Sequence, residues 1–444
     1  MRPAWEREGT AYLLGIDGLT LDVISPMMEQ GELPHFARLA RDGCSGPLET
    51  VAPTNSSLLW TSIATGCHHR DHGIDGFRRY RLLSMNLTRD ALRKARKYGL
   101  KRVVKGLERV GLLTNYLLDG RHMRRKPFWD ILSDAGAGVG VVNWWHTWPA
   151  WPINGFIVSD RLFHWRMAAT INVDRPESGL THPDWLHEMV AKVSVKPDRV
   201  RMEELLRFVN MSDEEARGLL STSFTRQEVR SELRYVIALD LTCWRVFEHC
   251  LASFPHLTVA ALYLRGTDVA QHAAFQFAPW AREAQVPEED RRRFAQVVPQ
   301  AYRTVDGFVG EILSRMGPQD ALLVVSDHGF AFQEKRGKYG HARGRPPGVF
   351  YALGREFLRG HRVRRASIYD VAPSLLRICG LPPARDMQGH ALEEAFTPEF
   401  RREHPPLEPV ATYGAPQSRA AAPAPSREVE EKIKEHLRGL GYFD

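Results

Sequence analysis

Short runs of apolar residues recur along the chain, and most of them end in a glycine or a polar residue. Runs of this kind are typical of strands that are buried on both faces of a parallel sheet. The runs predicted to be strands are Tyr12–Ile16, Val139–Val142, Leu257–Leu264, Leu322–Val325 and Val349–Leu353. Predicted helices between them include Leu33–Arg41, Phe128–Ala135 and Tyr302–Arg315. This alternation predicts an α/β protein with a doubly wound, mostly parallel sheet flanked by helices.

Two stretches interrupt the alternation, and we interpret them as insertions into this core. Residues 78–126 are strongly basic and are predicted to form a helical insertion. Residues 163–251 are charged, and Glu228–Leu251 has helical periodicity, which predicts a largely helical cap. Residues 397–444 are predicted to form a linker rich in Pro and Ala, followed by an amphipathic helix over Arg427–Leu440. The core is then made up of residues 1–77, 127–162 and 252–396.

The distribution of charge sets the first insertion apart from the rest of the chain. The 444 residues carry a net charge of +7, yet the segment from Arg78 to Lys126 holds sixteen basic and three acidic residues. The remainder is therefore slightly acidic. Such a segment suits an anionic substrate, a nucleic acid or an anionic membrane surface, or it is a solvated insertion. No zinc finger or other specific nucleic-acid motif accompanies it.

Several features bear on where the protein resides. Its composition, 43 % hydrophobic and 25 % charged, is that of a globular protein. The first ten residues lack the apolar segment of a secretory signal, and no run reaches the roughly 18 apolar residues of a membrane span. The five cysteines form no CxxC pair, and their odd number does not suit a disulfide framework. We therefore expect a cytoplasmic protein without a transmembrane segment, whose oligomeric state the sequence leaves open.

Aspartate and histidine side chains gather at the ends of the predicted strands. In an open α/β sheet, ligands bind at the carboxyl ends of the strands. Three strand ends and one loop therefore bring candidate ligands to a single edge of the sheet. These ligands are Asp17, Asp268, His272, Asp327, His328 and His341.

The number and type of these residues predict a metal centre. Three carboxylates and three imidazoles exceed the four ligands of one tetrahedral ion, so they suit two ions about 3.5–4 Å apart. Asp268 and His272 are four positions apart and would share one face of a helix. Mixed Asp and His ligation favours zinc, with manganese or iron as alternatives. Any one of the six alone would be explained as a helix cap or a structural histidine.

A cluster of hydroxyl side chains precedes the predicted helix Leu58–Ala64. Thr54, Ser56 and Ser57 lie where the free N–H groups and positive dipole end of the helix would attract an anion. A nearby dication would lower the pKa of such a hydroxyl and make it a nucleophile. The alternative is that Ser56 or Ser57 only caps the helix.

With these residues in place, the sequence resembles the type I phosphodiesterases and nucleotide pyrophosphatases of the alkaline phosphatase superfamily. The resemblance implies an alkaline phosphatase-like core, a phosphorylated small-molecule substrate of the phosphodiester or nucleotide type, and two divalent ions, Zn²⁺ or alternatively Mn²⁺. The matching stretches are Gly15–Gly18, Pro53–Gly66, His72–Ile74, Asp268 with His272, Asp327–Gly329 and His341, with weaker likeness at Trp129–Leu132 and Tyr369–Pro373.

The resemblance also implies a role for each matching residue. One metal ion would be bound by Asp268, His272 and His341, and the other by Asp17, Asp327 and His328. The nucleophile of the family lies nine residues before a Thr-Gly pair, a position that Ser56 occupies here. Ser56 would contact the second metal ion and form a phosphoserine intermediate, which water would then hydrolyse.

Four positions depart from the family pattern, and one of them is Ser56, which replaces the threonine usual in the nucleotide pyrophosphatases. Thr267 and Gln271 stand where the family usually has Pro and Gly. Phe77 stands where the nucleotide pyrophosphatases have an asparagine that donates a hydrogen bond to a phosphate oxygen. Loss of such a donor costs about 3 kcal/mol of transition-state stabilisation unless another group replaces it. Phe77 and Asn143 are therefore candidate substrate-binding positions, and the side chains that could supply the donor are Arg78, Arg79 and Asn143.

Other functions stay open on the sequence. A phosphomonoesterase, or a phosphotransferase or mutase of the same superfamily, would use a similar ligand set. A non-catalytic anion-binding protein on the same scaffold would use the basic segment. A sulfatase is disfavoured, because neither Cys44 nor Cys67 lies in the Cys-x-Pro-x-Arg sequence that sulfatases need.

Overall fold

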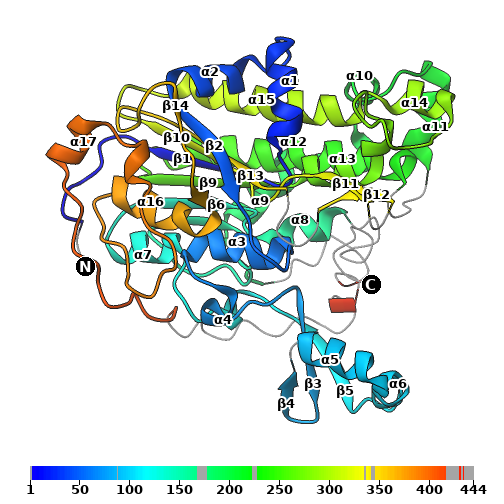
Figure 1. The fold of residues 1–444 in the computed structure, drawn as a ribbon, viewed down its shortest axis with the longest axis horizontal. Coiled ribbons are helices and arrows are strands. Elements are labelled where there is room, and N and C mark those ends of the chain that lie inside the picture. Colours follow the sequence, from blue (N-terminus) through cyan, green and yellow to red (C-terminus); the bar gives the residue numbers. More distant parts are fainter. Residues whose placement is uncertain are drawn as a thin grey trace.

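The computed structural model describes residues 3–87, 89–167, 178–222, 228–334, 337–341 and 346–416, and also residues 430, 431 and 434. Within them, the centre of the molecule is one large sheet (Figure 1). Its strands are β1 (Ala11–Ile16), β2 (Cys44–Glu49), β6 (Val139–Val142), β7 (Gly155–Val158), β8 (Thr181–His182), β9 (Val259–Leu264), β10 (Ala321–Val325), β13 (Gly348–Leu353), β14 (His361–Arg362) and β15 (Ala366–Ser367). Their order is β14-β2-β13-β10-β1-β9-β6-β7-β8, and β15 also pairs with β2.

The middle of this sheet is parallel, which confirms the predicted doubly wound α/β fold. Strand β1 runs parallel to both β9 and β10, and β6 runs parallel to β9 and β7. Towards one edge, β13 is antiparallel to β10 and to β2. The prediction that Val349–Leu353 is a parallel strand is therefore wrong in direction. The chain returns from β10 through the hairpin of β11 (Ala331–Gln333) and β12 (Lys338–Gly340), without the crossover helix that a parallel connection needs.

Helices cover both faces of the sheet, because successive residues of a strand point to opposite sides. Tyr12, Leu14 and Ile16 of β1 pack into one hydrophobic cluster, while Ala11 and Leu13 pack into another. The helices on the first face include α1 (Leu21–Glu29), α2 (Pro34–Asp42), α12 (Val229–Ser253), α13 (Gly266–Ala274), α14 (Glu288–Phe294) and α15 (Val297–Arg315). Those on the second face include α3 (Ser56–Thr65), α7 (Phe128–Asp134) and α16 (Val371–Ile378).

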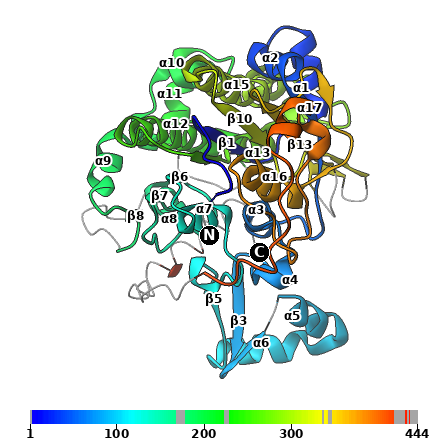
Figure 2. The same ribbon diagram turned by 90° about the vertical axis from the view of Figure 1, so that its left-hand side faces the viewer.

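Residues 78–117, which make up most of the basic segment 78–126, form a lobe that projects from the body of the molecule (Figures 1 and 2). The prediction of a helical insertion is wrong in part, because the lobe contains a three-stranded antiparallel sheet. Tyr80 and Leu82 alternate with arginines in its first strand, a strand pattern that the basic composition obscures. The elements are β3 (Arg78–Leu82), β4 (Met85–Leu87), α5 (Arg89–Ala95), a π-helical turn (Arg96–Leu100), α6 (Lys101–Arg109) and β5 (Leu113–Leu117).

Residues 163–251 are largely helical in their described part. Their last helix, α12, packs with β9 and with β6 and belongs to the main hydrophobic cluster, while β8 adds a short antiparallel strand to the large sheet. The proposed division of the chain into core, insertion and cap stays a prediction. The remaining elements of this segment are α8 (Asp160–Met167), α9 (Leu186–Val193), α10 (Met202–Leu206) and α11 (Asp213–Ser221).

The C-terminal part of the chain returns to the second face and to the lobe. Pro398–Glu403, expected in the linker, form α17. Most of the helix predicted over Arg427–Leu440 lies outside the described residues. Within it, the Lys434 ammonium is buried and donates a hydrogen bond to the Asn115 carbonyl at 3.1 Å. No helix in the described ranges has the length and apolar character needed to cross a membrane.

Candidate metal centre

The carboxyl ends of three neighbouring strands place the predicted ligands together. Asp17 follows β1, Asp268 and His272 lie on α13 directly after β9, and Asp327 and His328 follow β10. His341 comes immediately after β12. Potential ligand atoms lie within 4.8 Å of one another in two overlapping groups, Asp17 with Asp327 and His328, and Asp268 with His328 and His341.

The distances between the candidate ligand atoms are described in two adjoining sets. In the first set, His328 Nε2 is 3.2 Å from Asp17 Oδ1 and 3.6 Å from Asp327 Oδ2. In the second set, His272 Nε2 is 3.6 Å from Asp268 Oδ1 and 3.2 Å from His341 Nε2, and His341 Nε2 is 3.9 Å from Asp268 Oδ1. The structure therefore brings all six predicted ligands together, with His272 and His341 on the more exposed side.

The buried polar atoms of this centre fit bound cations. Asp17 Oδ1, Asp268 Oδ1, both carboxylate oxygens of Asp327 and His328 Nε2 are buried, and none of them has a partner in hydrogen-bonding geometry among the described residues. Buried polar atoms normally have such partners. A cluster of carboxylate oxygens and imidazole nitrogens in this state is the donor set of a divalent metal site.

The charges of the cluster lead to the same conclusion. Burial and the Asp17 charge raise the pKa of Asp268 to about 8 and that of Asp327 well above its ordinary value. Burial also acts to raise the pKa of Asp17, but the contact with His328 and the hydrogen bond from Tyr263 keep it below its ordinary value. Three carboxylates this close ionise together only when positive charge compensates them, and divalent cations supply that charge.

Two aromatic side chains that the sequence analysis did not identify hold Asp17 in place. The Tyr263 hydroxyl and the Trp60 indole N–H both donate hydrogen bonds to Asp17 Oδ2, at 2.5 and 3.3 Å. Gly15 makes room for this arrangement, because a Cβ there would lie 2.5 Å from the Trp60 ring. A glycine inside an apolar strand is a sequence signal of such a close approach.

The residues that depart from the family pattern tie α13 to the loop after β1. Thr267 Oγ1 donates a hydrogen bond to the Asp17 carbonyl, and Gln271 Nε2 donates one to the Gly18 carbonyl at 2.8 Å. The Tyr302 hydroxyl donates to Gln271 Oε1 at 3.1 Å. Both residues therefore support the backbone that carries Asp17, and neither occupies the position of a predicted ligand.

Helix α3 distinguishes between the two adjacent serines. Ser56 is buried at its first position, and Trp60 lies one turn later on the same side, where its indole reaches Asp17. Ser57 instead lies 2.9 Å from the Gly76 carbonyl and 2.7 Å from His146 Nε2. Asn55, and not either serine, caps the helix through its contact with the Leu58 N–H. Ser56 is thus on the side of α3 that faces the ligand cluster.

The candidate substrate-binding residues occupy different surroundings. Phe77 is buried edge-on against Trp145, with ring centres 4.9 Å apart, and its side chain carries no hydrogen-bond donor. The Asn143 amide donates to the Tyr263 carbonyl at 3.0 Å and so joins the end of β6 to β9. The Arg79 guanidinium contacts the Gly73 carbonyl and the Asp75 carboxylate.

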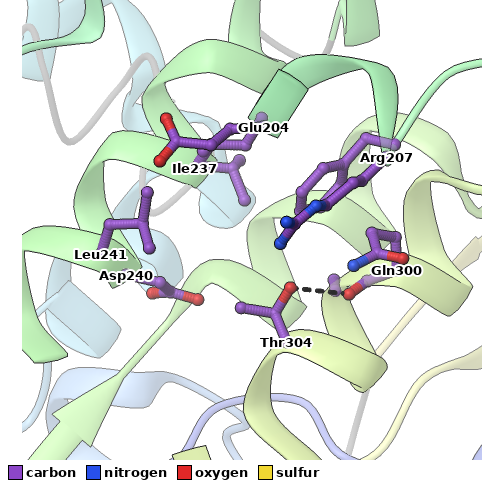
Figure 3. Close-up of a pocket in the computed structure, with 10 residues that line it drawn as sticks. Glu204, Arg207, Ile237, Asp240, Leu241, Gln300 and Thr304 are labelled. Carbon is purple, nitrogen blue, oxygen red and sulfur yellow. Dashed lines mark hydrogen bonds between the residues drawn. The ribbon is translucent and has the colours of Figure 1, made fainter. Parts of the chain in front are cut away.

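A cavity of about 60 Å³ lies away from these ligands, between α10, α12 and α15 (Figure 3). Glu204, Arg207, Asp240 and Thr304 contribute polar groups to its wall, and none of the lining residues is a predicted ligand. Asp240 Oδ1 accepts a hydrogen bond from the Gly266 N–H at 3.1 Å, at the start of α13. Burial raises the pKa of Asp240 to about 7. The cavity therefore lies beside the first residue of α13, the helix that carries Asp268, and none of the candidate metal ligands lines it.

The mostly parallel α/β sheet, with Asp and His side chains clustered at its carboxyl edge, agrees with a family match that makes this chain a hydrolase of the alkaline phosphatase superfamily. The chain belongs to the type I phosphodiesterase/nucleotide pyrophosphatase family, whose model matches residues 11–340. Members of this family are metal-dependent hydrolases of phosphate esters.

Several solved structures are similar to this chain at low sequence identity. Murine ectonucleotide pyrophosphatase/phosphodiesterase 5, inactive and in complex with AMP, is 12 % identical with a TM-score of 0.45, over 88 % of this chain and 100 % of that chain. The human protein of the same name is 11 % identical with a TM-score of 0.46, over 87 % and 99 %. Phosphonoacetate hydrolase from Sinorhizobium meliloti 1021, in complex with phosphonoformate, is 16 % identical with a TM-score of 0.41, over 76 % and 60 %. No curated protein matches this chain.

Proposed function

We propose that the protein hydrolyses phosphate esters of the phosphodiester or nucleotide type at a two-metal site, with Ser56 as the nucleophile. The observation that carries this proposal is the set of buried Asp and His atoms without hydrogen-bonding partners at the strand ends. Ser56 supports it, because Ser56 lies on the side of α3 from which Trp60 reaches Asp17.

Asp268, His272 and His341 would hold one ion, and Asp17, Asp327 and His328 the other. The set suits Zn²⁺, with Mn²⁺ as the alternative. When bound, such a pair of ions stabilises charge on the phosphoryl group and lowers the pKa of a hydroxyl or water.

The start of α3 would bind the phosphoryl group, and Ser56 would act as the nucleophile. The first backbone N–H groups of α3 point towards an anion placed beside Ser56. Ser56 Oγ would lose its proton and form a bond to phosphorus while the bond from phosphorus to the leaving-group oxygen breaks; that oxygen takes up a proton, the alcohol leaves, and phosphoserine remains. Water then attacks phosphorus, phosphate or its monoester leaves, and Ser56 recovers its hydroxyl proton.

One observation favours a second candidate function, hydrolysis of phosphomonoesters. Phe77 packs against Trp145 at the position where the nucleotide pyrophosphatases have an asparagine, so its side chain offers no donor to a diester oxygen. A phosphotransferase reaction through the same phosphoserine would differ only in the acceptor. The cytoplasmic location stays a prediction.

The test compares Ser56→Ala with Ser57→Ala on zinc- and manganese-loaded protein. We expect Ser56→Ala to abolish hydrolysis of p-nitrophenyl phosphate, bis-p-nitrophenyl phosphate and thymidine p-nitrophenyl phosphate while it keeps two metal ions per chain. Ser57→Ala should keep turnover and lose about 1 kcal/mol of stability, because it removes a buried hydrogen bond.

Phosphopeptide mapping after a rapid acid quench should find phosphate on Ser56. Full turnover by Ser56→Ala would contradict the proposed nucleophile, and a wild-type protein that binds fewer than two ions would contradict the two-metal site. Faster cleavage of the monoester than of either diester would select the second candidate.

A further inference from the structure

The projecting lobe, residues 78–117, has a hydrophobic core too small to bury its apolar residues. That core consists of Tyr80, Leu92, Val104 and Leu113. Across the described ranges, eight large hydrophobic side chains are exposed, and seven of them lie on the lobe, between 43 % and 78 % exposed. These seven are Leu83, Met85, Tyr98, Leu100, Val103, Val110 and Leu112. Single exposed apolar residues are normal, but their concentration on one projecting element marks an interaction surface.

These side chains follow one side of α6 and continue to the turn after β3. Leu100, Val103 and Val110 are spaced by three and seven positions, so they line the side of α6 next to the buried Val104. At the end of the helix, the Leu83 N–H donates to the Leu112 carbonyl at 3.0 Å, which brings the turn after β3 beside the turn after α6. The exposed apolar residues thus extend from α6 to the end of the hairpin.

Basic side chains occupy the other side of the same helix. Lys101, Lys105 and Arg109 follow at intervals of four and are exposed, as is Arg102. The lobe as a whole contains twelve basic and two acidic residues. An apolar side with exposed aliphatic residues next to a Lys- and Arg-rich side is the pattern of a helix that lies in a membrane interface.

We propose that the lobe binds the surface of membranes that contain anionic phospholipids. Its exposed aliphatic residues would enter the boundary between headgroups and acyl chains, and its basic side chains would contact lipid phosphates. Complementary charge favours this partner over a second copy of the chain, because two such lobes repel one another. Nucleic acid is disfavoured, because single-stranded chains bind by stacking on aromatic rings and Tyr98 is the single exposed aromatic residue described on the lobe.

The proposal does not depend on the catalytic one, but it has a consequence for it. The lobe begins directly after Phe77, and the Gly76 carbonyl lies 2.9 Å from Ser57 Oγ at the start of α3. The start of α3 therefore lies on the side of the body from which the lobe projects, and a membrane bound by the far end of the lobe would face this side.

The test is co-sedimentation of the full chain with vesicles of phosphatidylcholine alone or mixed with phosphatidylserine, at low and high NaCl. We expect binding that requires phosphatidylserine and weakens with salt. The triple variant Lys101→Glu, Lys105→Glu, Arg109→Glu should lower the partition coefficient by at least about 100-fold. The double variant Val103→Asn, Val110→Asn should lower it by about tenfold or more.

Matched controls lie elsewhere on the surface. Charge reversal of Arg401 and Arg402, which are exposed on α17, should leave vesicle binding unchanged. All lobe variants should hydrolyse soluble p-nitrophenyl esters as the unmodified chain does, and Ser56→Ala should bind vesicles as tightly as the unmodified chain does. These controls distinguish a failure of the membrane proposal from a failure of the catalytic proposal. Four results would each overturn the proposal. They are equal binding to both vesicle types, loss of binding in the α17 control, tighter binding to single-stranded DNA than to vesicles, and self-association without vesicle binding.

Discussion

Removal of one hydroxyl group, in Tyr263→Phe, tests how Asp17 is held. Tyr263 lies near the end of β9 and donates to Asp17 Oδ2, while Asp17 Oδ1 lies 3.2 Å from His328 Nε2. Phenylalanine keeps the ring, which packs edge-on against Trp60 with centres 4.8 Å apart. The change therefore deletes one hydrogen bond to a buried carboxylate and leaves the packing in place.

Two independent estimates give the size of the effect. A hydrogen bond to a charged group contributes about 1.5–3 kcal/mol. Loss of a group that orients a metal ligand typically lowers metal affinity or activity by about 10- to 100-fold, which corresponds to about 1.4–2.8 kcal/mol. The Trp60 N–H, 3.3 Å from the same oxygen, preserves part of the orientation. We expect one of the two proposed metal ions to bind about tenfold more weakly or worse, and excess metal to restore most of kcat.

Chelator-competition titration with Zn²⁺ measures this affinity, and urea unfolding of the metal-free protein measures stability. Tyr351→Phe is the matched control, because Tyr351 is equally buried in β13 but contacts no metal ligand among the described residues. Unchanged affinity for both ions in Tyr263→Phe would refute the reasoning. An equal loss of affinity in Tyr351→Phe would attribute the effect to the core in general.

Two further predictions concern the same centre. Burial and a neighbouring carboxylate raise the pKa of Asp268 to about 8, and nearby carboxylates, against the effect of burial, raise that of His328 to about 10. Both groups have a higher pKa in the folded state than in the unfolded state, so the metal-free protein loses stability as pH rises from about 4 to about 10. The midpoint of its unfolding in EDTA should therefore fall across this pH range, and added zinc should reduce the fall. An unfolding midpoint in EDTA that does not change with pH would contradict the assignment. Gly15→Ala places a Cβ 2.5 Å from the Trp60 ring and should lower the free energy of unfolding in urea by about 1–3 kcal/mol. Gly307→Ala in α15 is the control, because its added Cβ meets no atom within 4 Å, and it should be neutral or stabilising. Equal effects of the two substitutions would contradict the packing argument.

The clustering of the candidate ligands could be predicted from the sequence because most of them follow directly from a local signal. Asp17 and Asp327 come immediately after apolar runs, and strand ends in a parallel sheet converge on one edge. The supporting residues have no such signal. Tyr263 bonds to a residue 246 positions away, and only the register of β1 against β9 brings the two together.

The parts of the fold that sequence patterns predicted incorrectly also depend on partners distant in the chain. An apolar run indicates a buried strand, but its direction depends on the connection that precedes it, and the hairpin before β13 has few apolar residues to reveal it. In the lobe, the arginines of β3 conceal the alternation of Tyr80 and Leu82, whose partners lie on β5. Short strands of this kind are defined by pairing more than by their own composition.

The departures from the family pattern fix two parts of the candidate metal centre relative to each other. Asp17 and Asp268 belong to different ligand sets, so the spacing of the two sets depends on how α13 is fixed against the loop after β1. Thr267 and Gln271 supply that connection through hydrogen bonds to the carbonyls of Asp17 and Gly18. A Cβ at Gly18 would lie 2.9 Å from Gln271 Nε2, so Gly18 and Gln271 are matched to each other. The residues that flank the Asp-x-x-x-His pair in this chain are therefore fitted to the loop that carries Asp17, and the candidate ligands Asp268 and His272 are both present.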